Sequence, residues 1–315
     1  MDNFIFSINV TIPIFLVILL GWFLKRIKLI TDEFAEIANK YVFKVALPVL
    51  LFEDIATTSI LDDMSWSFVI FCFLVTFAIF TLVWIFAHFY LRYDRDMEGA
   101  FAQAAARGSA AVLGIAFVEN ICGNAGMAPL MIVAAVPLFN VYSVVILTFC
   151  GRNRTGGLAG IKKACINILK NPIIIGIVLG IPFSIFSIDI PAIPAKTITY
   201  IAQTATPIAL IAVGAGFSGG SALKKLKPGL VASFIKLIAL PAIFIPMAVA
   251  FGFNASEIVA ILIMTGSPTT VTCYIMAKNM DNDEVLSSNV IVLTTILSSI
   301  TLTLWIFVLK TIGAI

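Results

Sequence analysis

The apolar residues of this chain fall into long, nearly unbroken runs that are separated by short polar segments. An α-helix rises about 1.5 Å per residue, so it needs about 20 apolar residues to cross a bilayer. Runs of about that length lie at 6–24, 34–56, 66–91, 99–119, 128–150, 171–188, 195–217, 228–252, 255–277 and 286–310. The pattern predicts an all-α integral membrane protein with ten transmembrane helices.

Composition excludes the main alternatives to a membrane protein. Hydrophobic residues make up 61% of the 315 residues, and charged residues only 12%. A water-soluble protein needs more polar groups to cover its surface, and a membrane-spanning barrel would show strands of alternating hydrophobicity. We therefore exclude a soluble enzyme, a nucleic-acid-binding protein and an outer-membrane barrel. We expect the protein to be surrounded by a lipid bilayer.

The basic residues are distributed unevenly among the polar segments. If the N-terminus lies outside, most of the 20 Lys and Arg residues fall in inner loops and inner helix ends, whereas Lys196 and Lys310 lie outside. The outer segment 53–66 carries only acidic charges. Because cytoplasmic loops are enriched in Lys and Arg, this pattern predicts a multi-pass protein of the inner or plasma membrane with both termini outside.

The two halves of the chain resemble each other. Residues 13–21 read PIFLVILLG and residues 172–180 read PIIIGIVLG, at an offset of 159 that also places Pro48 on Pro207. Chance matching of common apolar residues is the alternative to a true repeat. Each half would hold five spans, and an odd number reverses the second half in the membrane. Such inverted repeats are found in many secondary transporters.

This repeat predicts a division of the chain into three parts. Residues 1–150 would form the first five-helix repeat and residues 171–315 the second, inverted one. Residues 151–170 would connect them on the cytoplasmic side, and this basic segment is too short to be a domain.

Two predicted spans are interrupted at equivalent positions by residues that weaken helices. The first interruption is at Arg107, Gly108, Ser109 and Gly114, and the second is at Gly266, Ser267, Pro268, Thr269 and Thr270. Glycine weakens a helix and proline removes a backbone donor. Unwound backbone inside a membrane must line a cavity or pack in protein, so paired interruptions are a sign of a transport site.

Arg107 gives this site a chemical preference. It lies about 12 Å into its span at helical rise, which is too deep for its side chain to reach water easily. A buried arginine is costly unless it is paired, and its guanidinium suits a bidentate carboxylate. The alternative is a structural bond to unwound carbonyls. Lys236 is a second cation within a span and a weaker candidate.

No catalytic or metal-binding constellation emerges from the sequence. Residues 214–219 match GxGxxG and residues 216–220 match GxSxG, but both end an apolar span without a preceding strand. The scattered cysteines show no metal-ligand spacing. We therefore expect neither an enzyme nor a bound cofactor.

Several stretches carry a resemblance that covers the whole chain. They are Arg107-Gly108-Ser109 followed by Gly114-Ile115, Asn171-Pro172, TPIALIAVGAGFS at 206–218, KLIALP at 236–241, and YIMAKNMDNDEVLSSNVIVLTTILSS after the Pro268 interruption. These stretches resemble the auxin efflux carrier family, which contains plant PIN-type carriers and bacterial organic-acid permeases. The short central connection is similar to that of bacterial members.

The resemblance implies an architecture like that of bile-acid carriers and NhaA-type antiporters. Spans one, two, six and seven would form a scaffold that dimerises, and spans three to five and eight to ten a transport domain with crossed broken helices four and nine. Substrate would bind beside the crossing, and an elevator movement would expose it alternately to each side. Carried over by position, the site comprises Arg107, Gly108, Ser109, Gly114, Asn140, Tyr142, Ser267, Pro268, Thr269 and Thr270, with Pro48, Leu51 and Pro207 on the scaffold opposite.

The leading hypothesis is therefore a secondary carrier or uniporter that moves a small organic anion, such as malate or malonate, outward. Proton- or sodium-coupled carboxylate uptake is a second hypothesis. A transporter-like sensor that binds a metabolite without moving it is a third.

Overall fold

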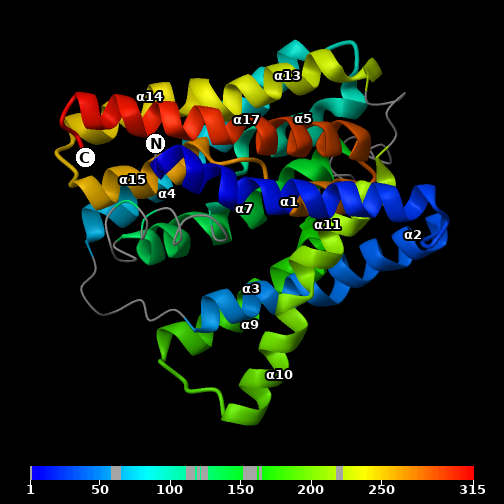
Figure 1. The fold of residues 1–315 in the computed structure, drawn as a ribbon. Coiled ribbons are helices and arrows are strands. Elements are labelled where there is room, and N and C mark those ends of the chain that lie inside the picture. The colour runs from blue at the N-terminus through cyan, green and yellow to red at the C-terminus, as the bar shows by residue number, and fades with distance from the viewer. Residues whose placement is uncertain are drawn as a thin grey trace.

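The computed structural model describes residues 2–57, 65–110, 118, 121, 127–151, 162, 165–217 and 223–315, with side chains from Ile12 onward. Within this part of the chain every regular element is a helix (Figure 1). The elements are α1 (Asp2–Arg26), α2 (Asp32–Tyr41), η1 (Val42–Ala46), α3 (Leu47–Ala56), α4 (Trp66–Tyr90), η2 (Arg95–Met97), α5 (Glu98–Ala106), α7 (Ala128–Cys150), α9 (Pro172–Ile185), α10 (Ala192–Gln203), α11 (Ala205–Gly216), α13 (Leu226–Phe234), η3 (Ile235–Ala239), α14 (Leu240–Ala250), α15 (Ala255–Gly266), α16 (Thr272–Asn279) and α17 (Glu284–Thr311). The all-α prediction is confirmed.

Five helical stretches of the described residues are long and apolar enough to cross a membrane. They are Trp66–Tyr90, Ala128–Cys150, Ala192–Gly216, Leu226–Ala250 and Glu284–Thr311. Shorter apolar helices lie at Pro172–Ile185 and Ala255–Gly266. These stretches agree closely with predicted spans and are those of an integral membrane protein. Much of the predicted connection 151–170 lies outside the described residues.

Side-chain caps set where several helices begin. The Asn171 side chain accepts a 2.9 Å hydrogen bond from the Ile173 amide, so α9 starts at the predicted Asn-Pro pair. Asn254 and Glu257 form a reciprocal capping box at the start of α15. Asp283 accepts from the Leu286 amide at 2.9 Å and begins α17. Each cap satisfies an amide that has no partner within its helix.

Two π-helical segments, η1 and η3, each end at the alanine of an Ala-Leu-Pro sequence, and the prolines are Pro48 and Pro241. Proline has no N–H, so the carbonyl four residues earlier loses its helical donor. In η3 that carbonyl belongs to Leu237, and the indole Nε1 of Trp305 on α17 donates to it at 3.0 Å. The wide turn is therefore stabilised by a side chain from a neighbouring helix.

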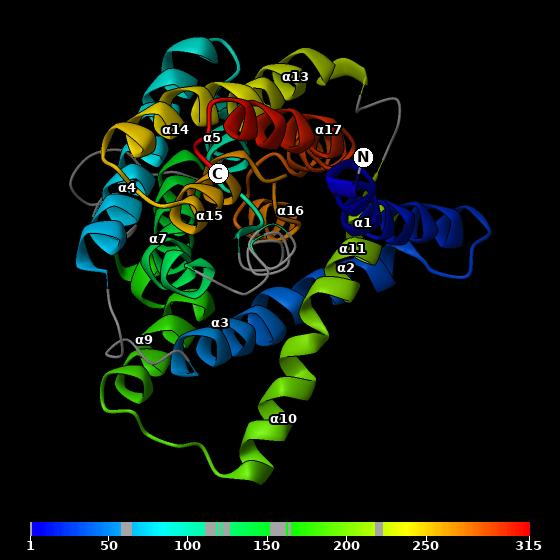
Figure 2. The same cartoon turned by 60° about the vertical axis from the view of Figure 1, so that its left-hand side comes forward.

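The helices pack in two groups. On one side α3 packs against α9 and α10, and α1 packs against α11. On the other side α4 packs against α5 and α7, α14 against α15, and both α13 and α16 against α17. Figures 1 and 2 show α3, α9 and α10 on the lower side and α13, α14 and α17 on the opposite side. The contact of α1 with α17 joins the two groups.

Glycines allow helices of the first group to approach at backbone distance. A Cβ on Gly21 would meet the backbone of Ile211, and one on Gly180 would lie 3.0 Å from the carbonyl oxygen of Phe52. Gly21 on α1 therefore faces α11, and Gly180 on α9 faces α3.

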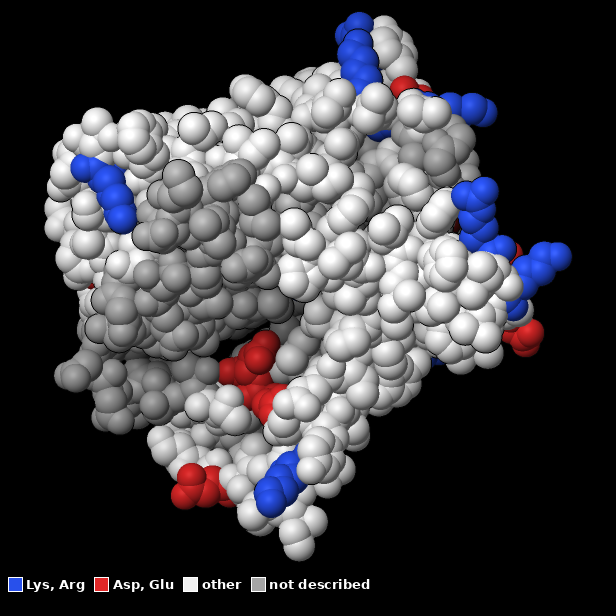
Figure 3. Space-filling model, viewed as in Figure 1, with Lys and Arg blue, Asp and Glu red and all other residues white. Residues whose placement is uncertain are grey.

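Basic side chains gather at one end of the molecule, at the right of Figure 3, where α1 ends and α2 begins. The same view shows a hollow with acidic side chains at its edge. Two carboxylates from the end of α3 line pockets: Glu53 lines one of about 350 Å³, and Asp54 lines one of about 200 Å³ together with Val136 of α7.

Candidate functional site

The two predicted helix interruptions are present, and each begins where a helix ends. Helix α5 ends at Ala106, and Arg107 has extended backbone angles (φ −86°, ψ 119°). Helix α15 ends at Gly266, and Ser267 is also extended (φ −70°, ψ 157°) before α16 begins. The residues that follow Ala110 are mostly outside the described part of the chain, so Gly114 and the second half of the first interrupted span are not placed.

The two interruptions contact each other through their backbones. Gly108 and Thr269 form an antiparallel bridge, and the Ser109 amide donates to the Pro268 carbonyl at 2.9 Å. The Thr269 hydroxyl donates to the carbonyl of Ala104 at 2.7 Å. Backbone groups that two helices leave unpaired at these ends are thus satisfied by each other.

Gly108 is required by this close contact. A Cβ at this position would meet Ser267 Oγ and would lie 2.9 Å from Nζ of Lys236. The Ser267 hydroxyl is fully buried and has no hydrogen-bond partner.

Arg107 is only 5% exposed and points towards α7 and α16. One guanidinium nitrogen donates to Oδ1 of Asn140 at 2.8 Å, and the other lies 3.0 Å from Sδ of Met276 and 3.5 Å from Oγ of Ser143. The Asn140 amide is itself fixed by a 2.9 Å bond to the Val136 carbonyl. Among the described residues, no carboxylate forms an ion pair with Arg107.

Lys236 is a full member of the site, although in the sequence it was a weaker candidate than Arg107. It is fully buried, and its Nζ donates to the carbonyls of Thr265, Met264 and Ala106 at 2.8, 3.2 and 3.3 Å. The first two belong to the end of α15 and the third to the end of α5. The lysine therefore joins both interruptions.

The structure brings together seven of the predicted residues, namely Arg107, Gly108, Ser109, Asn140, Ser267, Pro268 and Thr269. Thr270 is half-buried and accepts from the Thr272 hydroxyl at 3.4 Å.

The remaining predicted residues make other contacts. The hydroxyl of Tyr142 lies 3.1 Å from the Thr81 hydroxyl on α4. Pro48 packs at backbone distance on Gly176 of α9, Leu51 is buried on α3, and Pro207 is exposed on α11.

Three neighbours of Arg107 were missed by the sequence analysis. They are Gln103, Ser143 and Met276. Gln103 lies four residues before Arg107 and Ser143 three residues after Asn140, so helical spacing could have identified both. The amide nitrogen of Gln103 lies 3.3 Å from Sδ of Met276, and its buried Oε1 has no partner.

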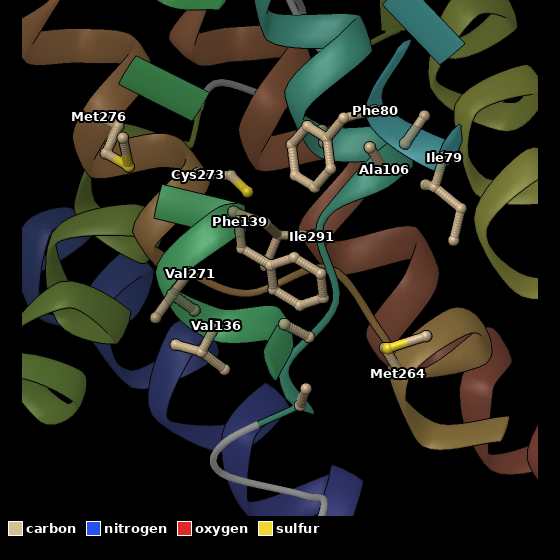
Figure 4. Packing of buried hydrophobic residues seen from close by; sticks show 14 of the residues in the cluster. Ile79, Phe80, Ala106, Val136, Phe139, Met264, Val271, Cys273, Met276 and Ile291 are labelled. Atoms are coloured by element: carbon tan, nitrogen blue, oxygen red, sulfur yellow. The ribbon is translucent and has the colours of Figure 1, made fainter. Parts of the chain in front are cut away.

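Apolar side chains from several helices surround the interruptions. Figure 4 shows Phe80 and Phe139, from α4 and α7, beside Ala106, with Met264, Cys273 and Ile291 around them. The two phenylalanine rings are 5.7 Å apart between centroids. Such surroundings strengthen electrostatic interactions, because little water screens them.

Comparison with known proteins identifies the family. The family model described as "Membrane transport protein" matches residues 6–306. An uncharacterized transporter of Methanocaldococcus jannaschii is 22% identical over 96% of this chain and 98% of its own length. An uncharacterized transporter of Escherichia coli is 23% identical over 88% of this chain and 89% of its own. A proposed malonate transporter of Rhizobium meliloti is 21% identical over 96% of this chain and 95% of its own.

The match covers both groups of helices and both interruptions. With the apolar helices and the absence of strands among the described residues, it confirms the resemblance found in the sequence. The chain belongs to the membrane transport protein family of auxin efflux carriers and is a multi-pass membrane transporter.

Proposed function

We propose that this transporter carries a small organic anion and binds its carboxylate beside Arg107. The observation that supports this most is an uncompensated positive site: Arg107 and Lys236 are both buried at the helix interruptions. The ion pairs of the described residues involve other side chains. A buried charge without a partner is costly, and an anionic substrate would offset that cost.

The donors around Arg107 favour a carboxylate in particular. Its contacts with Met276 and Ser143 are weak, because a thioether is a poor acceptor and 3.5 Å is a long hydrogen bond. Asn140 holds the guanidinium in place. A carboxylate would replace weak contacts by charge-assisted ones. The name of the Rhizobium meliloti relative supports malonate or a similar dicarboxylate as the first substrate to test.

The proposed architecture has ten transmembrane helices in two inverted five-helix repeats, with helices four and nine crossed at the interruptions. Backbone-distance contacts support the repeat. Gly21 faces Ile211, and the positions 159 residues from each, Gly180 and Phe52, face each other. In one contact the glycine belongs to the first half of the chain, and in the equivalent contact it belongs to the second half.

The proposed mechanism is an elevator in which a scaffold of spans one, two, six and seven holds a moving transport domain of the other six. The two packing groups support this division. The contact of Gly216 on α11 with Tyr274 on α16 would lie on the sliding surface. The pocket lined by Asp54 and Val136, between α3 and α7, would give access along the same boundary. In this proposal both termini lie outside, and the scaffold forms a homodimer.

Counterflow in proteoliposomes tests the function. Proteoliposomes that contain the purified protein and are loaded with unlabelled malonate should accumulate labelled malonate. Arg107→Ala should reduce the initial rate of this uptake at least about tenfold, as expected for a lost charge-assisted contact. Arg107→Lys should recover part of it. Arg92→Gln, at an exposed arginine, is the matched control and should transport normally. Full transport by folded Arg107→Ala would contradict the role of Arg107, and binding without counterflow would favour a sensor.

The direction of transport follows from charge. An inside-negative potential favours outward movement of an anion by about 2.3 kcal/mol per charge per 100 mV. Imposing such a potential should accelerate efflux of malonate. Efflux that ignores the potential but follows an imposed sodium or proton gradient would favour the coupled symporter.

A further inference from the structure

The surroundings of the Lys236 ammonium have the composition of a cation site. Its three partners are all backbone carbonyl oxygens, of Ala106, Met264 and Thr265. No carboxylate of the described residues pairs with it. Oxygen ligands of this kind are those that alkali cations prefer, as in selectivity filters built from carbonyls.

The carbonyls are available because the helices end there. The helical donor for Met264 would be the amide of residue 268, which is proline and has no N–H. The donor for Thr265 would be the Thr269 amide, which instead donates to Thr294 Oγ1 at 3.0 Å. Ala106 is the last residue of α5. Two helix C-termini therefore direct partial negative charge at one point.

A fourth oxygen faces Gly108 on the same side as the ammonium. Lys236 Nζ lies 2.9 Å from the position that a Cβ on Gly108 would occupy, and Ser267 Oγ lies closer still to that position; the serine hydroxyl is buried without a partner. An unsatisfied buried hydroxyl is unusual and points to a ligand position. Nζ is thus bonded by three carbonyls, and one unused hydroxyl lies at the same glycine.

We propose that the Lys236 ammonium is a tethered cation in an alkali-cation site formed by the ends of α5 and α15. The carrier then needs no free sodium ion at this point, and removing the side chain exposes a site that takes a free monovalent cation. The consequence for transport rests on the proposed function, but cation binding does not.

Two variants separate the cation site from other roles of the side chain. Lys236→Ala leaves the oxygens and the space, whereas Lys236→Met fills the space with an uncharged chain of similar length. The thermal unfolding midpoint of each purified protein is measured in choline chloride and in the chlorides of lithium, sodium, potassium and ammonium at equal ionic strength.

We expect a saturable rise of about 2 °C or more for Lys236→Ala in at least one of the small cations over choline, since a ligand that binds only the folded state stabilises it. Lys236→Met and the wild type should not respond. Adding Ser267→Ala to Lys236→Ala should weaken the response. The proposal would be overturned if none of the four cations raised the unfolding midpoint of folded Lys236→Ala, or if they raised that of the wild type equally.

If Lys236→Ala does not fold in any salt, the wild-type protein still tests the proposal. Its thermal midpoint and its malonate counterflow should be unchanged when choline replaces sodium and potassium on both sides. A requirement for either ion would overturn the tethered cation while leaving the carrier function intact. Cation binding by Lys236→Ala without malonate transport in the wild type would instead reject only the proposed function.

Discussion

Gly108 and Thr269 pair their backbones across the two interrupted segments, although 161 positions separate them in the sequence. This bridge and the bond from the Ser109 amide to the Pro268 carbonyl provide partners at the point where two helices stop. An unpaired peptide group inside a bilayer costs several kcal/mol. Neither interruption is therefore stable without the other, and substitutions in one should affect both.

The first prediction concerns Gly108. Gly108→Ala would place a methyl group against Ser267 and 2.9 Å from Nζ of Lys236, and overpacking of this kind costs about 1–3 kcal/mol. We expect a lower thermal midpoint in detergent. Gly229→Ala is the matched control: its Cβ would lie 3.4 Å from Leu293, so alanine in this helix should be neutral or stabilising. Equal midpoints for the two variants would contradict the close contact.

The second prediction concerns Thr269. Thr269→Val removes the hydroxyl that donates to the Ala104 carbonyl, and a buried acceptor left unsatisfied costs about 1–3 kcal/mol. Thr269→Ser should restore most of the stability because it keeps the hydroxyl. Thr311→Val, on the exposed end of α17, provides the comparison, since that hydroxyl bonds only a carbonyl of its own helix. The idea fails if valine is tolerated equally at both positions.

The third prediction ranks two glycines at helix contacts. Gly21→Ala would meet the Ile211 backbone, which moves only if α11 moves, whereas Gly180→Ala would meet the Phe52 carbonyl at 3.0 Å. We expect both to lower the unfolding midpoint, and Gly21→Ala by more. The reverse order would show that α1 and α11 separate more easily than α3 and α9.

The fourth prediction concerns pH and Glu98, which lies at the start of α5. Burial raises the pKa of this carboxyl, but hydrogen bonds from Arg95 and His88, both at 2.9 Å, and the charges of these residues outweigh burial and hold the pKa below its ordinary value. A carboxyl whose folded-state pKa is lowered stabilises the protein above its ordinary pKa, and this contribution is lost as pH falls through the lowered value.

Glu98→Gln should therefore unfold at a lower temperature than the wild type at pH 7. The difference should shrink as the pH falls below about 4, measured by thermal melts across a pH series. Glu33→Gln, at an exposed position of α2, should show little difference at any pH. A gap between Glu98→Gln and wild type that stays constant down to low pH would contradict the interaction.

Local patterns in the sequence predicted the long helices and the places where helices stop. Apolar runs identified α4, α7 and α17 nearly to the residue, because a bilayer imposes one length on every span. Gly108 and Pro268 identified the interruptions, because glycine and proline act on the backbone where they stand.

Contacts between distant segments could not be predicted in the same way. Lys236 reaches the interruptions from a π turn, which shifts the helical register that sequence spacing assumes. The aromatic side chain of Tyr142 packs on Phe77 and Phe80 of α4, a contact that the sequence did not predict. Both outcomes depend on which helix lies beside which, and hydrophobic periodicity does not carry that information.

The indole of Trp305 donates to the Leu237 carbonyl, one residue from Lys236. The fluorescence emission of an indole depends on its hydrogen bonding and on nearby water, so Trp305 can serve as an intrinsic fluorescent probe of this turn. Replacing the other three of the 4 tryptophans, Trp22, Trp66 and Trp84, by phenylalanine would leave one emitter at the wide turn. A substrate that alters the surroundings of Lys236 would then shift the emission of Trp305, so binding could be followed without any added label.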